Sequence, residues 1–261
     1  MSDVKNEEKD PYLVPAIAQA ARVLFCLTEA ESSYVSLIEV CDKVGIHRSR
    51  AFSVLHTLQK FGFVQRNPEG KGYSLGPGLL GLSRRYLDNL STPKLAEPLL
   101  EDLARKSGST AALGLIAERN VFIAAKHEGG NPLGFTTRVG HRFPLTYGCH
   151  GKAIAAFLPK QELNELLKGK KLYFHGAPER FDKDKLDYEI KRCRERGYAE
   201  DLEEMVPGLS FVAAPVLGAT ERPVGYVVVM GLPSQESAKR AGPMVAETGK
   251  ALSRLLGFKI R

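Results

Sequence analysis

Cysteine is scarce in this 261-residue chain, and its four cysteines lie far apart, at Cys26, Cys41, Cys149 and Cys193. No two of them form a Cys-x-x-Cys pair, which argues against a disulfide framework and a structural zinc site, so we interpret them as reduced thiols. No apolar run approaches the roughly 20 residues that cross a bilayer. Residues 2–10 are polar and mostly charged, which indicates neither a signal peptide nor a transit peptide. We expect a cytoplasmic protein without a membrane partner.

Signatures of catalysis are also missing. The sequence has no Gly-x-x-x-x-Gly-Lys loop and no Gly-x-Ser-x-Gly elbow, and its six histidines form no His-x-x-His pair. Cys149 next to His150 is the best enzymatic alternative, because a thiol at a helix N-terminus would be activated. Adjacent helical residues diverge, however, and make a poor nucleophile and base. We expect no catalytic residue, cofactor or metal; a small-molecule enzyme or a thiol redox sensor using Cys149 remains the alternative.

The composition is that of an ordinary globular protein, with 43% hydrophobic and 26% charged residues. At roughly 100 to 200 residues per domain, the length predicts two domains. The 37 basic residues exceed the 30 acidic ones, and a net charge of +7 makes an anionic partner worth seeking. Through Ser91 the count is 11 basic against 10 acidic residues, and the remaining 26 against 20 leave +6 in the second part. Nucleic-acid binding must therefore be argued from where the basic residues fall.

The first part of the chain has the pattern of a winged helix-turn-helix. Apolar residues recur at helical spacing over 16–27, 37–44 and 51–61, and a glycine follows the second and the third pattern. Two helices joined by a tight glycine turn are typical of a helix-turn-helix. Two short runs at 63–66 and 71–75 then flank a Pro and Gly turn, which predicts a β-hairpin wing. We assign residues 1–76 to this domain.

The rest of the chain predicts a linker and an α+β domain. Gly76-Pro77-Gly78 and Ser91-Thr92-Pro93 bracket a helical pattern, so we expect a linker helix over 77–92. From residue 93 to residue 261, helices and strands follow one another in no strict βαβ order, which favours a largely antiparallel sheet flanked by helices. The expected strands cover 110–117, 121–127, 134–139, 209–217 and 224–230, and one helix is expected to begin at Lys152.

The third helical pattern carries the candidate DNA contacts. If its apolar residues face the core, the opposite face near the N-terminus presents Arg48, Ser49, Arg50, Phe52, Ser53 and His56. This end of a winged helix-turn-helix enters the major groove, where arginine bonds guanine, serine donates to phosphates or bases, and phenylalanine meets a thymine methyl. We expect Arg66 and Lys71 to hold the DNA backbone from the wing. The alternative is a solvated basic helix in an unrelated bundle.

Several motifs carry a family resemblance. Leu37-Ile38-Glu39-Val40 and Gly45-Ile46-His47-Arg48-Ser49-Arg50 match a helix-turn-helix pattern, with Arg50 where Thr is common. Three later motifs agree in order and spacing: 138–145 leading into Gly151-Lys152-Ala153, Arg196-Gly197-Tyr198, and Pro207-Gly208-Leu209. From about Ala16 to the C-terminal helix, the chain resembles the IclR family of bacterial transcriptional regulators. The resemblance implies a winged helix-turn-helix, a linker helix, a GAF-like effector-binding domain, homodimers or homotetramers on double-stranded operator DNA, and a small organic acid as effector.

A candidate effector pocket follows from the residues and from this resemblance together. Residues 148–152 open a helix, and the unpaired N–H groups and positive dipole of a helix N-terminus favour an anion. The resemblance implies that the backbone amides of Cys149 and His150 hold a carboxylate, and that the pocket side chains are Asp201, Phe211, Val228 and Met230.

The last three of these side chains are apolar where family members that bind very small keto acids have polar groups. We therefore hypothesise an aromatic or other hydrophobic carboxylate. Two alternatives remain open. Phe211, Val228 and Met230 would fill a core, and Asp201, among Glu200, Glu203 and Glu204, would lie in a solvated turn or a divalent-metal site.

Overall fold

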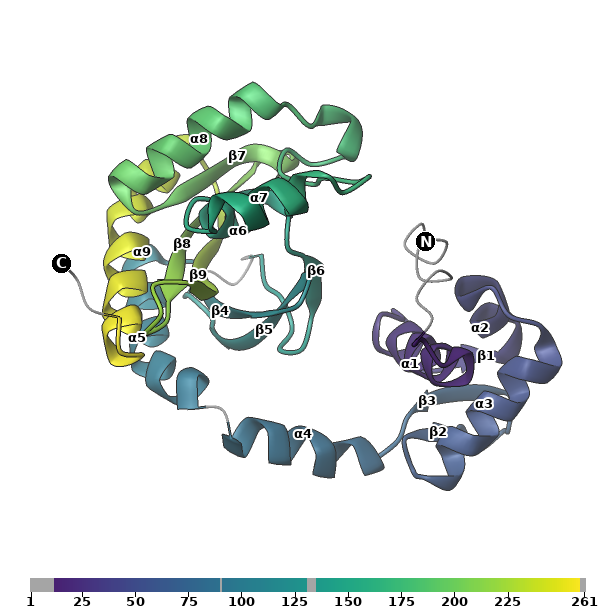
Figure 1. Cartoon of the computed structure of the whole chain (residues 1–261). Coiled ribbons are helices and arrows are strands. Elements are labelled where there is room, and N and C mark those ends of the chain that lie inside the picture. Colours follow the sequence, from purple (N-terminus) through teal and green to yellow (C-terminus); the bar gives the residue numbers. More distant parts are fainter. Residues whose placement is uncertain (1–11, 90, 131–134, 259–261) are drawn as a thin grey trace. The chain divides into compact units, whose positions relative to one another are not determined.

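The computed structural model describes residues 12–89, 91–130 and 135–258, and it divides the chain into two compact units, Met1–Leu90 and Ser91–Arg261 (Figure 1). We describe each unit by itself. The charged start at 2–10 lies outside the described residues. No helix in the described part of the chain is long and apolar enough to cross a membrane.

Over residues 12–75, the N-terminal unit contains three helices and a small antiparallel sheet. The helices are α1 (Pro15–Thr28), α2 (Leu37–Val44) and α3 (Arg48–Lys60), and the sheet has the order β1-β3-β2, with β1 at Val35–Ser36, β2 at Val64–Arg66 and β3 at Gly72–Leu75. Their buried apolar residues form one cluster, in which Leu55 and Val40 are fully enclosed. The three predicted helices and the wing are confirmed. The two-residue strand β1 was missed because so short a segment has no detectable period.

Local interactions define the turn between α2 and α3. The Ser36 hydroxyl accepts a hydrogen bond from the Glu39 backbone N–H, and the Glu39 carboxylate accepts one from the Ser36 N–H, which together form a capping box at the start of α2. Gly45 ends α2 in the left-handed region, at φ 72°. α3 then begins at Arg48, after the N-cap residue His47, so the turn is as tight as the sequence indicates.

Two helices occupy the region of the expected linker. α4 covers Gly78–Asn89 and α5 covers Ser91–Ser107, while residue 90 lies outside the described residues. We expected Ser91-Thr92-Pro93 to break the helical pattern, but α5 begins there. A proline is tolerated in the first turn of a helix, because its missing N–H would have no intrahelical partner. The division into 1–76, 77–92 and 93–261 stays a prediction.

The C-terminal unit is built on a six-stranded antiparallel sheet in the order β6-β5-β4-β9-β8-β7. The strands are β4 (Thr110–Ala117), β5 (Asn120–His127), β6 (Arg142–Pro144), β7 (Ala199–Val206), β8 (Leu209–Leu217) and β9 (Pro223–Leu232). The predicted α+β class is confirmed. The strand expected at 134–139 is wrong: residue 134 lies outside the described residues, 135–138 are irregular, and the strand lies at β6 instead.

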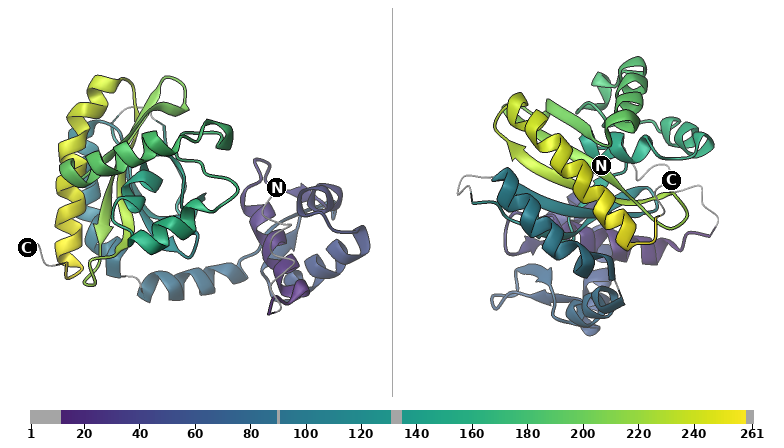
Figure 2. Two further views of the ribbon diagram at one scale, coloured as in Figure 1. Left: turned by 45° about the horizontal axis from the view of Figure 1, so that its top comes forward. Right: turned by 90° about the vertical axis from the view of Figure 1, so that its left-hand side faces the viewer.

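Helices cover both faces of this sheet. α5 and α9 (Gln235–Leu255) lie side by side on one face, and α6 (Gly148–Ala155), α7 (Lys160–Leu167), the 3-10 turn Pro178–Arg180 and α8 (Lys183–Arg196) belong to the other side (Figure 2). β9 serves both cores: Val227 and Val229 pack toward α5 and α9, and Tyr226, Val228 and Met230 pack toward α6. The period of two along a strand thus supplies two apolar layers.

A glycine allows one aromatic ring to lie in the α6 layer. Gly114 of β4 is the register partner of Tyr226 of β9. A Cβ atom on Gly114 would lie 2.2 Å from the Tyr226 ring, far inside van der Waals contact. The fully buried ring of Tyr226 therefore occupies the space that a side chain at position 114 would need.

Replacing Gly114 with alanine should destabilise the C-terminal unit by about 1 to 3 kcal/mol, the usual cost of overpacking a core. Urea denaturation followed by circular dichroism measures this change. Gly130→Ala is the matched control, because its Cβ would meet no atom of the described part of the chain within 4 Å. Equal stabilities of the two variants would contradict the close approach of Gly114 and Tyr226.

Candidate functional site

The six predicted DNA contacts on α3 are all exposed. Phe52, a large apolar side chain, is 48% exposed, and its ring stacks on His56 with centroids 6.2 Å apart. The first turn of α3 contains no acidic residue, and its N-cap residue His47 makes no side-chain cap. Arg48 and Arg50 therefore stand at a helix end whose backbone N–H groups also favour an anion.

Arg50 is held by a residue that no sequence pattern indicates. Its Nε donates a hydrogen bond of 2.7 Å to Oε1 of Gln19 on α1. The two residues are 31 positions apart, so no local pattern could connect them. The bond uses Nε and not the two Nη groups, which are the donors that grip a base edge or a phosphate in pairs. Ser53 differs, because its hydroxyl donates to the Ser49 carbonyl at 3.0 Å within the helix.

The wing is ordered by its own turn. The Asn67 side-chain oxygen accepts hydrogen bonds from the backbone N–H groups of Lys71 and Gly72, at 2.8 and 3.0 Å. Lys71 is exposed beside this turn. Arg66 is also exposed, and its guanidinium lies 5.1 Å from the centre of the Tyr73 ring. The wing thus presents two exposed cations on a fixed backbone.

A cavity lies in the C-terminal unit between α6 and the sheet, with a volume of about 490 Å³ when its open mouth is included. All six predicted effector residues line it: Cys149, His150, Asp201, Phe211, Val228 and Met230. Eight further lining residues were missed, namely Ile123, Phe135, Phe143, Tyr147, Gly148, Met205, Val206 and Tyr226. Most of these are apolar or aromatic, and in a sequence such residues cannot be told from ordinary core residues. None of the lining residues in the described ranges is a lysine or an arginine.

The N-terminus of α6 forms one end of the cavity. α6 begins at Gly148, within the segment 148–152 that was expected to open the helix, whereas its apolar pattern alone placed the start at Lys152. The Cys149 thiol lies against the backbone N–H groups of Cys149 and His150, the two amides expected to hold a carboxylate. Burial raises the pKa of the Cys149 thiol well above its ordinary value, with the charge of Asp201 adding to the effect. The thiol is therefore protonated, which disfavours a nucleophilic or redox-sensing role.

Asp201 is fully buried and lies on β7, a strand that the sequence did not predict. One carboxylate oxygen, Oδ1, accepts hydrogen bonds from the backbone N–H groups of Glu204 and Met205, at 2.9 and 3.3 Å. The other carboxylate oxygen, Oδ2, has no hydrogen-bond partner among the described residues. Burial raises the pKa of Asp201 to about 6, although Lys152 and these backbone bonds oppose the rise. The solvated-turn alternative for Asp201 is wrong, because Asp201 is buried in a strand. The sequence did not indicate this strand because acidic residues surround Asp201.

Lys152 belongs to the same helix, α6, and it is wholly buried. Its Nζ lies 2.8 Å from a carboxylate oxygen of Glu189 and 2.5 Å from one of Glu204. Burial alone would lower the pKa of Lys152, but the two carboxylates outweigh it and raise the pKa. The ammonium is therefore charged and compensated in place.

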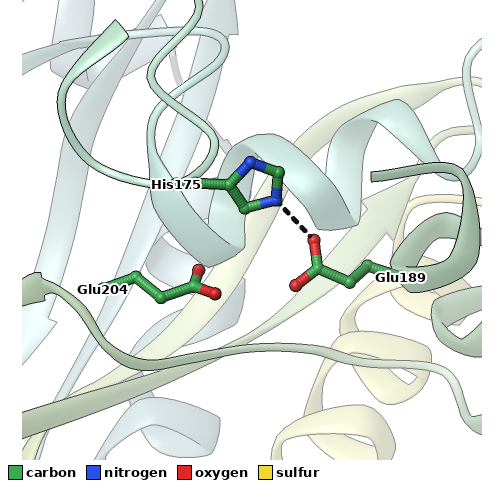
Figure 3. A group of neighbouring side chains, drawn as sticks. All are labelled: His175, Glu189 and Glu204. Atoms are coloured by element: carbon green, nitrogen blue, oxygen red, sulfur yellow. Dashed lines mark hydrogen bonds and ion pairs between the residues drawn. The ribbon is translucent and has the colours of Figure 1, made fainter. Parts of the chain in front are cut away.

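His175, Glu189 and Glu204 converge closely enough to suggest a metal site (Figure 3). His175 Nδ1 accepts a hydrogen bond from the Asp182 backbone N–H at 3.3 Å, so Nε2 carries the proton and donates to Glu189 at 2.9 Å. Both ring nitrogens are thus used, and Lys152 already neutralises the carboxylates. This set fits an ion-pair network better than a metal ion.

The raised pKa of Asp201 predicts a pH dependence of stability. The pKa of Asp201 is about 6 in the folded chain and has its ordinary value of 3.8 in the unfolded chain. Between these two values the folded chain binds more protons than the unfolded chain, so the free energy of unfolding falls as pH rises from about 4 to 6. Asp201→Asn cannot ionise. We expect the stability of the wild type relative to this variant to fall by about 2 to 3 kcal/mol between pH 4 and pH 7, in urea denaturation. A difference that is constant over this range would contradict the assignment.

Comparison with known proteins identifies the family to which both parts of the chain correspond. The family model for the IclR helix-turn-helix domain matches residues 16–68, and the one for the C-terminal part of IclR bacterial transcriptional regulators matches residues 84–254. The glycerol operon regulatory protein of Streptomyces griseus is 31% identical over 249 residues, which cover 94% of this chain and 97% of that protein.

Solved structures show the same fold. An IclR transcriptional regulator from Alicyclobacillus acidocaldarius has a TM-score of 0.81 and 26% identity, covering 94% of this chain and all of that one. An IclR homolog from Microbacterium hydrocarbonoxydans, complexed with 4-hydroxybenzoate, has a TM-score of 0.76 at 16% identity, covering 92% and 98%. The predicted combination of a helix-turn-helix domain and a C-terminal effector domain is confirmed. This chain belongs to the IclR family of bacterial transcriptional regulators.

Proposed function

We propose that this regulator contacts double-stranded operator DNA through α3 and the β2–β3 wing, and that a small organic acid in the cavity of the C-terminal unit controls the contact. The observation that carries the proposal is the pairing of an exposed basic helix start in one unit with an aromatic cavity closed by a helix N-terminus in the other. The proposed DNA contacts are Arg48, Ser49, Arg50, Phe52, Ser53, His56, Arg66 and Lys71.

The two groups of DNA contacts have different roles. Arg50, with its Nη groups not used by Gln19, is placed to read a base edge in the major groove. Lys71 and Arg66 lie in the wing, and their charges suit phosphates, which carry no sequence information. Base reading and backbone binding are therefore separable by mutation.

We also propose that the protein forms a homodimer or a homotetramer. α4 lies within the proposed linker, residues 77–92. Dimeric helix-turn-helix proteins place two recognition helices about one DNA turn apart, which doubles the contact with a symmetric operator. Exposed apolar side chains on α1 and α4 support self-association: Ile17 is 68% exposed, Leu80 70% and Leu82 58%. We assign these exposed apolar side chains to the proposed interface between subunits.

An acid of more than three carbons suits the cavity. The walls contain aromatic side chains from several elements, and Phe135 meets Phe211 edge to face at 5.3 Å. Because no lining lysine or arginine is present among the described residues, the α6 N-terminus is the positive end available to a carboxylate. The effector contacts proposed are the amides of Cys149 and His150 and the side chains of Asp201, Phe211, Val228 and Met230. An IclR homolog of the same fold was solved with 4-hydroxybenzoate, which supports an aromatic acid as a candidate.

Arg50→Ala should weaken binding to the preferred operator by about 1 to 3 kcal/mol and reduce the preference over scrambled DNA. Lys71→Ala should weaken binding to all sequences alike and lower the slope of log affinity against log salt by about one. Fluorescence anisotropy over a salt series, on an operator selected from random DNA by the wild-type protein, measures both.

Lys170→Ala serves as the control for lost charge, since Lys170 is an exposed lysine in the C-terminal unit. It should leave affinity and salt slope unchanged. Wild-type binding and salt dependence in both the Arg50 and the Lys71 variant would overturn the DNA-contact assignment.

Benzoates should raise the melting temperature of the full-length chain, whereas pyruvate and glyoxylate should leave it unchanged because they cannot fill the aromatic walls. At a concentration of about 100 times the Kd, a ligand adds about 2.7 kcal/mol of stability. A thermal-shift screen measures the effect, with glycerol as a neutral comparison because one relative is a glycerol operon regulator. Stabilisation by pyruvate, glyoxylate or glycerol and none by benzoates would overturn the aromatic-acid proposal.

A further inference from the structure

Two residues that line the cavity each leave one buried polar atom that has no hydrogen-bond partner among the described residues. These atoms are Nε2 of His150 and Oδ2 of Asp201. His150 is 7% exposed and Asp201 is fully buried. A buried polar atom without a hydrogen-bond partner is destabilising, so two of them at one cavity indicate that a ligand completes their bonding.

The protonation state of the His150 ring decides whether Nε2 donates or accepts a hydrogen bond. The His150 ring makes a hydrogen bond to the backbone carbonyl of Pro144. Because Nε2 is the atom without a partner, Nδ1 makes this bond and carries the hydrogen. Burial lowers the pKa of His150 to about 3, so the ring is neutral at ordinary pH. Nε2 is then a lone pair that accepts hydrogen bonds and cannot donate them.

The ring cannot turn easily to find another partner. His150 stacks on Tyr226 with ring centroids 4.6 Å apart and an angle of 10° between the rings, and on Tyr147 at 5.6 Å. Tyr226 in turn lies against Gly114. The acceptor is thus held in one place between aromatic rings, as a specificity group should be.

We propose that the effector carries a hydroxyl group as well as its carboxylate, and that this hydroxyl donates a hydrogen bond to Nε2 of His150. The proposal rests on the organic-acid function proposed above and narrows it to a hydroxy acid. A carboxylate has no hydrogen to give and would leave Nε2 unsatisfied. A hydroxyl is also less costly than an ammonium group to bring into an apolar site.

Isothermal titration of the full-length protein with benzoate, the three monohydroxybenzoates and their methoxy ethers tests the proposal. At least one hydroxybenzoate should bind about tenfold more tightly than benzoate, as expected for a hydrogen bond to a buried, otherwise unsatisfied acceptor. The matching methoxy ether should lose this advantage, because it has no hydrogen to donate.

His150→Phe keeps an aromatic ring beside Tyr226 and removes the acceptor. In this variant the hydroxyl preference, which is the ratio of hydroxybenzoate affinity to benzoate affinity, should fall to about one. Ser210→Ala is the matched control, because Ser210 has another buried, unpartnered oxygen but does not line the cavity. It should keep the full preference.

A measurement on the wild type covers the case in which His150→Phe does not fold. With ¹⁵N-labelled histidine, the unprotonated nitrogen of one histidine should shift on binding the preferred hydroxybenzoate and stay in place with benzoate. No such shift, a preference that survives His150→Phe, or equal binding of benzoate and all hydroxybenzoates overturns the hydroxyl contact and leaves the organic-acid function standing. Binding of no acid at all overturns both, whereas operator binding is measured separately.

Discussion

The buried ion pairs of Lys152 are the constraint on which the ligand cavity depends. An ammonium enclosed by protein is tolerated only with compensating charge, and Glu189 of α8 and Glu204 of β7 supply it from two sides. His175 then binds the other oxygen of Glu189, and Lys185 binds Glu204 from the surface. This network ties α6 to α8 and β7, and the same helix α6 supplies the cavity end at Cys149. Because Lys152 is not among the residues that line the cavity, its charge leaves the cavity walls mostly apolar.

The sheet imposes the second constraint, because helices bury both of its faces. Alternate residues of β9 belong to different cores, so a slip of one residue would exchange Val227 with Val228 and bring the wrong side chains to the cavity. The stack of His150, Tyr226 and Gly114 crosses from α6 through β9 to β4. Rigid packing of this kind turns a histidine, usually a proton carrier near neutral pH, into a fixed neutral acceptor.

Much of this could be predicted from the sequence because it is local. Helical periods and the glycines that follow α2 and α3 predicted the helices of the first unit, and the order and spacing of the family motifs predicted that Cys149, His150 and Asp201 share one pocket. What was missed depends on contacts between distant segments. The strand β7 was missed because its acidic residues interrupt the alternation of apolar and polar residues that indicates a strand. Asp201 is nevertheless buried, because its burial depends on contacts with distant segments and not on its neighbours in sequence. The lining role of Tyr226 likewise required knowing which strands pair.

The bond between Gln19 and Arg50 has a consequence for how such a regulator diversifies. α3 carries the side chains that we propose to contact DNA, but the orientation of Arg50 also depends on Gln19 of α1. An exchange at position 19 would redirect the guanidinium without altering any residue of the recognition helix. A comparison of α3 sequences alone would then assign the same operator to two paralogues that bind different operators. Position 19 of α1 should therefore be included when operator sequence is inferred from protein sequence.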